Sequence, residues 1–112
     1  MGLGFSVDDS HDKYTVLSVA GEIDLATAPS LRMHLLDLIE QAKISLIVDL
    51  EAVDFLDSTG LGVLVSALKR VRGYQGDLAL VCTRPHVLRV FDITGLSRVF
   101  AIHETIDAAL NG

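Results

Sequence analysis

The tetrapeptide Asp57-Ser58-Thr59-Gly60 holds the residues of this chain best suited to chemistry, because it joins an acidic stretch to an apolar helical pattern. Asp57 or Ser58 can cap a helix here, since a side-chain oxygen at that position accepts a hydrogen bond from a free backbone amide. Such caps are common, so the tetrapeptide alone leaves open whether the Ser58 hydroxyl has a further function. The end of a buried strand in an α/β sheet is nevertheless where such domains usually place their working groups.

Two glycines, Gly60 and Gly62, lie in the first turn of the same helical pattern. Each costs a helix about 1 kcal/mol relative to alanine, so the pair needs a local reason. Close packing against the sheet is one reason, and the close approach of a docking partner is another. Phe55 is expected in the core, whereas Leu56 and Leu61 are expected to stay partly exposed as the apolar part of a docking surface.

Enzymatic chemistry finds little support in the other polar residues. Ser58 lacks the Gly-x-Ser-x-Gly elbow of serine hydrolases. Gly4 and Gly21 do not form a phosphate-binding glycine pattern with a following lysine. The histidines show no metal-ligand spacing: His11, His34, His86 and His103. We therefore expect no catalytic residue, no metal and no cofactor.

The acidic residues could instead suggest a magnesium site or a phospho-aspartate receiver domain: Glu22, Asp24, Asp49, Glu51, Asp54 and Asp57. A hard cation needs converging carboxylates, whereas Asp49 belongs to a strand and the others to loops. A receiver domain would also need a lysine after a later strand, and Thr83-Arg84-Pro85 offers none. Solvated loop carboxylates are the favoured interpretation.

The bulk composition favours one compact domain without a nucleic-acid partner. The chain has 112 residues, of which 50% are apolar and 21% charged. The net charge of −6 would repel the phosphate backbone of a nucleic acid. The basic cluster Lys69-Arg70-Val71-Arg72 is explained by a helix C-terminus, where positive charges are favourable. The single Cys82 forms no internal disulfide and is expected in the core. Neither a signal peptide nor a membrane-length apolar run is visible, so a cytoplasmic protein without a membrane partner is expected.

Hydrophobic periodicity predicts strands alternating with helices after an initial β-hairpin. The expected strands are 5–7, 14–20, 44–50, 77–82 and 99–102. The expected helices are 27–42, with Thr27 as its cap, 58–73, 85–95 and 104–110. The predicted fold is α/β: a mixed, centrally parallel sheet of about five strands packed by about four helices.

Two motifs together resemble the signatures of the STAS family, the sulphate-transporter and anti-sigma-factor-antagonist domains. The first is Asp57-Ser58-Thr59-Gly60-Leu61-Gly62, preceded by Ile47-Val48-Asp49-Leu50 and Val53-Asp54-Phe55. The second is the loop Gly21-Glu22-Ile23-Asp24 after the hairpin. The resemblance covers nearly the whole chain, which implies one STAS domain over 1–112 with a core of about 3–110. The free-standing length points to the bacterial antagonist branch.

In that branch, the serine that falls on Ser58 is the phosphate acceptor, and Thr59 is a minor candidate. The resemblance implies that the unphosphorylated protein binds an anti-sigma factor that is also a serine kinase, which frees the sigma factor. The kinase then phosphorylates the antagonist and releases it, and a metal-dependent phosphatase restores it. A phosphate adds about −1.5 to −2 charges, which the helix start should tolerate and a docked partner should not.

The expected partner-binding residues surround that serine: Glu22, Asp24, Leu56, Asp57, Ser58, Thr59, Gly60, Leu61 and Gly62. The alternative within the same fold is a stand-alone STAS subunit of a transport or stress-sensing assembly, in which the serine is not a switch.

Overall fold

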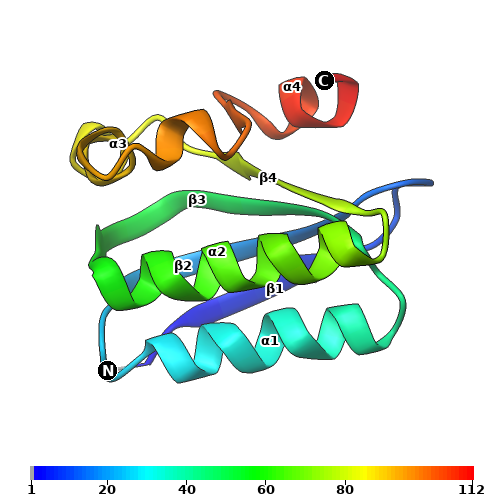
Figure 1. Cartoon of the computed structure of the whole chain (residues 1–112), viewed down its shortest axis with the longest axis horizontal. Helices are drawn as coiled ribbons and strands as arrows, with labels where there is room; N and C mark the ends of the chain where they lie inside the picture. The colour runs from blue at the N-terminus through cyan, green and yellow to red at the C-terminus, as the bar shows by residue number, and fades with distance from the viewer. Residues whose placement is uncertain (1) are drawn as a thin grey trace.

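The computed structural model describes residues 2–112 as a five-stranded sheet packed by helices (Figure 1). The strands are β1 (Gly4–Asp8), β2 (Thr15–Ile23), β3 (Ser45–Leu56), β4 (Asp77–Val81) and β5 (Ile102–His103). The helices are α1 (Ala28–Glu40), α2 (Ser58–Gly73), α3 (Pro85–Ile93), the 3-10 turn η1 (Leu96–Arg98) and α4 (Ile106–Asn111). This architecture confirms the predicted α/β class.

The sheet has the order β1-β2-β3-β4-β5. β1 and β2 form the predicted antiparallel hairpin, and every later neighbour is parallel. The β2–β3 ladder runs as far as the pair Ile23–Leu56, whereas the β3–β4 ladder ends at Asp49–Val81. The last part of β3 is therefore paired on one side only, and it leads directly into α2.

Helices cover the sheet from both faces. α1 and α2 lie side by side along one face, and α3 lies beyond the end of β4 (Figure 1). α4 covers the opposite face, where Ala109 packs with Ile47 and Val81. Ile47 alternates along β3 with Leu46 and Val48 of the main core, which explains why the two clusters lie on opposite faces.

Several element ends differ from the sequence prediction. β2 and β3 each continue beyond the predicted ends, because the two strands supply each other with hydrogen-bond partners through residues expected in loops. β5 is Ile102–His103 rather than 99–102, and α4 is Ile106–Asn111 rather than 104–110. α1 ends at Glu40, and Ala42 beyond it has φ 63, which no α-helix accommodates. Among residues 2–112, no helix is both long and apolar enough to span a bilayer.

Candidate functional site

Asp57 is the N-cap of α2, which resolves the choice between Asp57 and Ser58. Its Oδ1 accepts hydrogen bonds from the amides of Thr59 (2.9 Å) and Gly60 (3.1 Å). Its own amide donates to the Ile23 carbonyl at 3.1 Å, which ties the start of α2 to the end of β2. Ser58 is therefore the first helical residue, and its hydroxyl is not needed for capping.

Ser58 lies on an exposed stripe of α2. Ser58 and Gly62 are exposed, and Val65 is half-buried. These three residues are spaced i, i+4 and i+7, so they follow one another on the same side of the helix. Thr59 is half-buried and its amide is bound to Asp57, so of the two hydroxyls Ser58 is the more accessible.

The two glycines of α2 have different structural roles. A Cβ on Gly60 would lie 2.5 Å from both Ile23 Cγ2 and Leu56 Cδ1, so this glycine lets the helix pack against the ends of β2 and β3. A Cβ on Gly62 would meet no atom within 4 Å. Packing against the sheet therefore accounts for Gly60, whereas Gly62 leaves open surface one turn beyond Ser58.

Gly62→Ala is expected to raise the free energy of unfolding by about 1 kcal/mol, because it removes a glycine from a helix interior without a clash. Gly60→Ala is expected to lower it by about 1–3 kcal/mol, because the methyl group must displace packed side chains. Urea unfolding of the two variants beside the wild-type protein measures both changes. A loss of stability in Gly62→Ala would show that Gly62 is also a packing position.

The expected exposure of three apolar residues is wrong. Leu56 and Leu61 are buried, with 3% and 4% of their surface exposed, whereas Phe55 is 44% exposed. The β2–β3 register passes from Gly21–Val53 to Glu22–Phe55, so Asp54 is an extra residue in the ladder. An earlier shift, between Ser18–Asp49 and Ala20–Ala52, moves the core positions from Leu50 to Val53. The second shift then makes Leu56, rather than Phe55, the next core residue. Leu56, Gly60 and Leu61 therefore support the site from below and offer no side chain to a partner.

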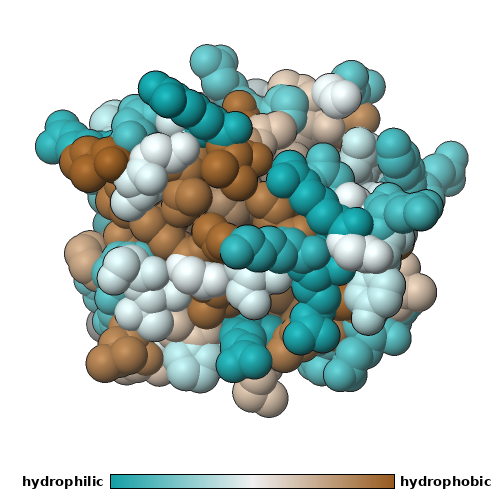
Figure 2. Space-filling view, viewed as in Figure 1, coloured by the Kyte–Doolittle hydropathy of each residue, from teal (hydrophilic) through white to brown (hydrophobic). Residues whose placement is uncertain are grey.

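Exposed apolar surface does lie close to Ser58. Figure 2 shows apolar side chains gathered above the first half of α2, on the side toward α3. Partly buried apolar residues on these two helices include Val65, Leu88 and Val90, whereas Val63 faces a hollow between α1 and α2. A partner that docks on Ser58 thus finds apolar surface beside it, although not from the leucines expected.

Carboxylates converge on a surface hollow, here called the acidic hollow, that is lined in part by Glu22, Asp24 and Asp54. Asp24 also has a structural task, because its Oδ1 accepts hydrogen bonds from the amides of Ala26 (3.0 Å) and Thr27 (3.1 Å). The hydrogen bond from the Asp57 amide to the Ile23 carbonyl places the start of α2 beside this end of β2. Glu22 and Asp24, two of the expected partner-binding residues, thus lie with Asp54 at the end of the sheet from which α2 begins.

Thr27 does not cap α1 with its side chain, contrary to the prediction. Its hydroxyl donates to the Glu22 carbonyl (2.7 Å) and accepts from the Asp24 amide (2.9 Å). The side chain therefore holds the loop that carries the acidic hollow, because backbone groups of that loop need partners as much as the helix start does.

Among residues 2–112, no group of three metal-ligating side chains is close enough to hold a metal ion. Asp49 already has hydrogen-bond partners within the sheet. Its carboxylate accepts one hydrogen bond from the Ser18 hydroxyl (3.2 Å) and another from the Glu51 amide (3.0 Å). Cys82 is buried, with 3% of its surface exposed, and burial raises the pKa of its thiol. It lies in the core, as predicted.

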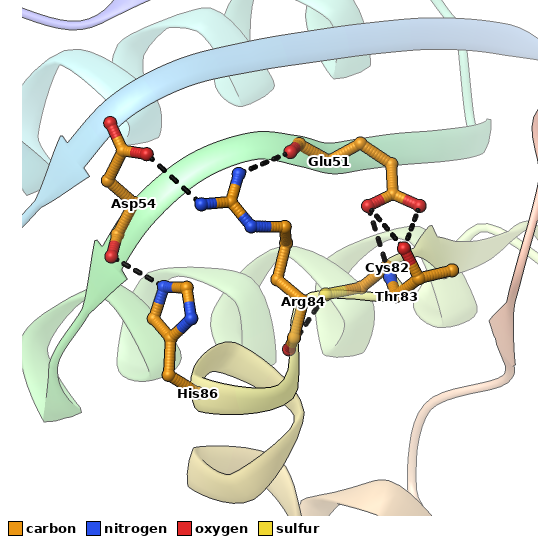
Figure 3. A network of polar contacts seen from close by, with 6 residues as sticks. All are labelled: Glu51, Asp54, Cys82, Thr83, Arg84 and His86. Carbon is orange, nitrogen blue, oxygen red and sulfur yellow. Dashed lines mark hydrogen bonds and ion pairs between the residues drawn. The ribbon is translucent and has the colours of Figure 1, made fainter.

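A polar network that the sequence did not reveal joins β3 to the start of α3 (Figure 3). Thr83 binds the Glu51 carboxylate through its amide (3.1 Å) and its hydroxyl (2.8 Å). Arg84 donates to the Glu51 carbonyl (2.9 Å) and to Asp54 Oδ1 (3.3 Å), and His86 Nε2 lies 2.6 Å from the Asp54 carbonyl. The partners are 30 to 33 residues apart, so local pattern gives no sign of these contacts.

Comparison with known proteins agrees with this geometry. The STAS domain family matches residues 7–109. An anti-sigma-B factor antagonist of Listeria monocytogenes is 36% identical over 112 residues, covering 100% of this chain and 97% of the relative. The protein of the same description in Bacillus subtilis is 43% identical over 86 residues, covering 77% and 78% of the two chains.

A solved structure also resembles this one over nearly its full length. The crystal structure of an anti-sigma factor antagonist from Mycobacterium paratuberculosis superposes with a TM-score of 0.89 at 35% sequence identity. The match covers 97% of this chain and 92% of that one. The resemblance therefore extends over the whole sheet and its helices, and not only over the serine motif.

Proposed function

Because this chain belongs to the STAS domain family, we propose that it is an anti-sigma factor antagonist whose binding is switched off by phosphorylation of Ser58. The curated relatives that share 36% and 43% identity with it are named as anti-sigma-B factor antagonists. Its partner is then an anti-sigma factor, and its place of action is the cytoplasm. The observation that carries the proposal is an exposed serine hydroxyl that has no capping task.

Ser58 has the geometry that a phosphate acceptor needs. Its hydroxyl is exposed on the first turn of α2, while Asp57 supplies the cap and holds the turn in place. A kinase can therefore reach the oxygen without unfolding the helix. In this proposal the anti-sigma factor is itself the serine kinase, and a metal-dependent phosphatase removes the phosphate. Thr59 is the minor acceptor, because it is half-buried.

The phosphate acts on the partner through charge and bulk. It adds about −1.5 to −2 charges beside a surface that already carries Glu22, Asp24 and Asp54. A partner surface fitted to a neutral hydroxyl would then meet a bulky, strongly hydrated group that has to be desolvated. The fold itself has no buried contact at Ser58 to lose, so we expect the change to remain local.

We place the partner-binding surface on those predicted residues that are exposed or half-buried. Ser58 and Gly62 form its centre, Thr59 and Asp57 are half-buried beside them, and Glu22 and Asp24 border it. Phe55 replaces Leu56 and Leu61 as an exposed apolar residue of this part of the chain. The surface thus combines an apolar patch with a negative border, which suits a partner that carries apolar and basic side chains.

The decisive experiment is phosphorylation by candidate anti-sigma kinases from the same genome, read by mass spectrometry of the peptide that contains Ser58 and Thr59. We expect one phosphate, on Ser58, in the wild-type protein and in Thr59→Ala, and none in Ser58→Ala. Phosphate on another residue would contradict the assignment. A stable complex that is indifferent to Ser58→Asp would instead support the alternative, a STAS subunit of a larger assembly without a serine switch.

A further inference from the structure

One edge of β3 is open just before the proposed phosphorylation site. The β3–β4 ladder ends at Asp49–Val81, but β3 itself continues to Leu56 and the Asp57 cap follows at once. Within residues 50–56, Ala52, Val53, Phe55 and Leu56 are paired with β2, and none of the seven is paired with β4. Carbonyl groups on an unpaired strand edge need other partners or water, and without them the strand is held less firmly.

Side chains from the start of α3 take the place of the missing strand (Figure 3). Arg84 uses both terminal nitrogens: Nη1 donates to the Glu51 carbonyl at 2.9 Å, and Nη2 to Asp54 Oδ1 at 3.3 Å. His86 Nε2 donates to the Asp54 carbonyl at 2.6 Å, since a carbonyl oxygen can only accept. A planar guanidinium suits this task because it presents donors in a fixed fork.

We propose that Arg84 is a positioning residue: its guanidinium holds the open edge of β3 and thereby fixes the orientation in which Ser58 meets its partner. Arg84 itself contacts Glu51 and Asp54, and only three residues separate Asp54 from Ser58. On the opposite edge, the hydrogen bond from the Asp57 amide to the Ile23 carbonyl already ties the end of the strand to β2. The role rests on the proposed function of Ser58 and adds a residue to it.

Arg72 provides a matched control at the far end of α2. It also makes one ion pair and one contact to a backbone carbonyl, with Asp77 Oδ1 and the Val99 carbonyl, each at 3.4 Å. Arg72→Ala therefore removes the same kinds of contact as Arg84→Ala, from a helix end that does not carry Ser58. Arg84→Lys keeps the charge but loses the fork, so it should restore only part of the effect.

The test measures amide hydrogen exchange of the full chain and its affinity for the anti-sigma kinase, in both alanine variants and in Arg84→Lys. We expect Arg84→Ala to speed exchange of amides in residues 52–57 by about tenfold and to lower the affinity by about tenfold as well. Arg84→Lys should fall between Arg84→Ala and the wild-type protein. Arg72→Ala should change neither quantity, even where urea unfolding shows a similar loss of overall stability.

Two results would overturn the proposal: unchanged exchange in residues 52–57 of Arg84→Ala, or a loss of affinity no greater than that of Arg72→Ala. If exchange in Arg84→Ala is faster but its affinity stays at the wild-type value, which is a case of the second result, Arg84 has only a structural role. Failure of the wild-type protein to bind any anti-sigma kinase would be a different outcome, because it would remove the proposed function. The exchange measurement needs no partner, so it would still decide whether Arg84 holds the edge.

Discussion

Replacing Ser58 with glutamate is expected to lower the affinity for the anti-sigma kinase by at least about a hundredfold, which corresponds to about 3 kcal/mol. The carboxylate adds charge at the centre of the proposed surface, next to the acidic hollow of Glu22, Asp24 and Asp54. A docked partner would have to desolvate that carboxylate without a fitted counter-charge. Isothermal titration calorimetry of the two proteins against the kinase measures the change.

Ser97→Glu is the control for the charge itself, because Ser97 is also exposed but lies on η1. It should bind the kinase as the wild-type protein does. Circular dichroism and amide NMR shifts of Ser58→Glu should remain native outside the first turn of α2, because Ser58 packs against nothing in the core. Tight binding by Ser58→Glu, or a rearranged sheet, would refute a switch that acts through local charge.

Leu61→Glu is expected to destabilise the domain by about 4 kcal/mol, which is a large fraction of the stability of a domain of this size. Leu61 is 4% exposed and belongs to the main core together with Leu64 and Ile23. A carboxylate there must either lose its hydration or push α2 away from the sheet. Thermal and urea unfolding measure the loss.

Gly62→Glu places the same side chain one residue further along, on open surface. It should keep the native fold and still weaken the kinase complex, because Gly62 lies on the stripe that Ser58 begins. Comparing Leu61→Glu with Gly62→Glu therefore separates a loss of core packing from a loss of kinase docking. A stable Leu61→Glu protein with impaired kinase binding would restore Leu61 to the interface and would contradict its burial.

Much of the fold could be predicted from the sequence because periodicity is a local property. The apolar run around Val48 and the helical spacing of Leu61, Leu64 and Leu68 identify the central strand and the helix that follows it. The apolar run 77–82 likewise predicted the burial of Cys82. Strand ends were harder to predict, since the continuation of β2 to Ile23 depends on β3 running alongside it.

The exposure of the residues before Ser58 depends on two bulges in the β2–β3 ladder. The core positions pass from Leu50 to Val53 across the first bulge and from Val53 to Leu56 across the second, which leaves Phe55 outward. No signal in the local sequence marks the position of such a bulge. The contacts of Arg84 and His86 were missed for a related reason, because they depend on how the end of β3 lies against a helix about thirty residues away.

The cap at the start of α2 affects how fully the charge of a phosphate on Ser58 would be exposed to solvent and to other proteins. The Asp57 carboxylate already occupies the amides of Thr59 and Gly60, and the Asp57 carbonyl accepts from the Leu61 amide. A phosphoryl group on Ser58 would therefore find these three amides occupied, although such amides are the donors that helices usually offer to anions. Its charge would remain turned toward solvent, where one arriving protein is repelled by it and another can recognise it.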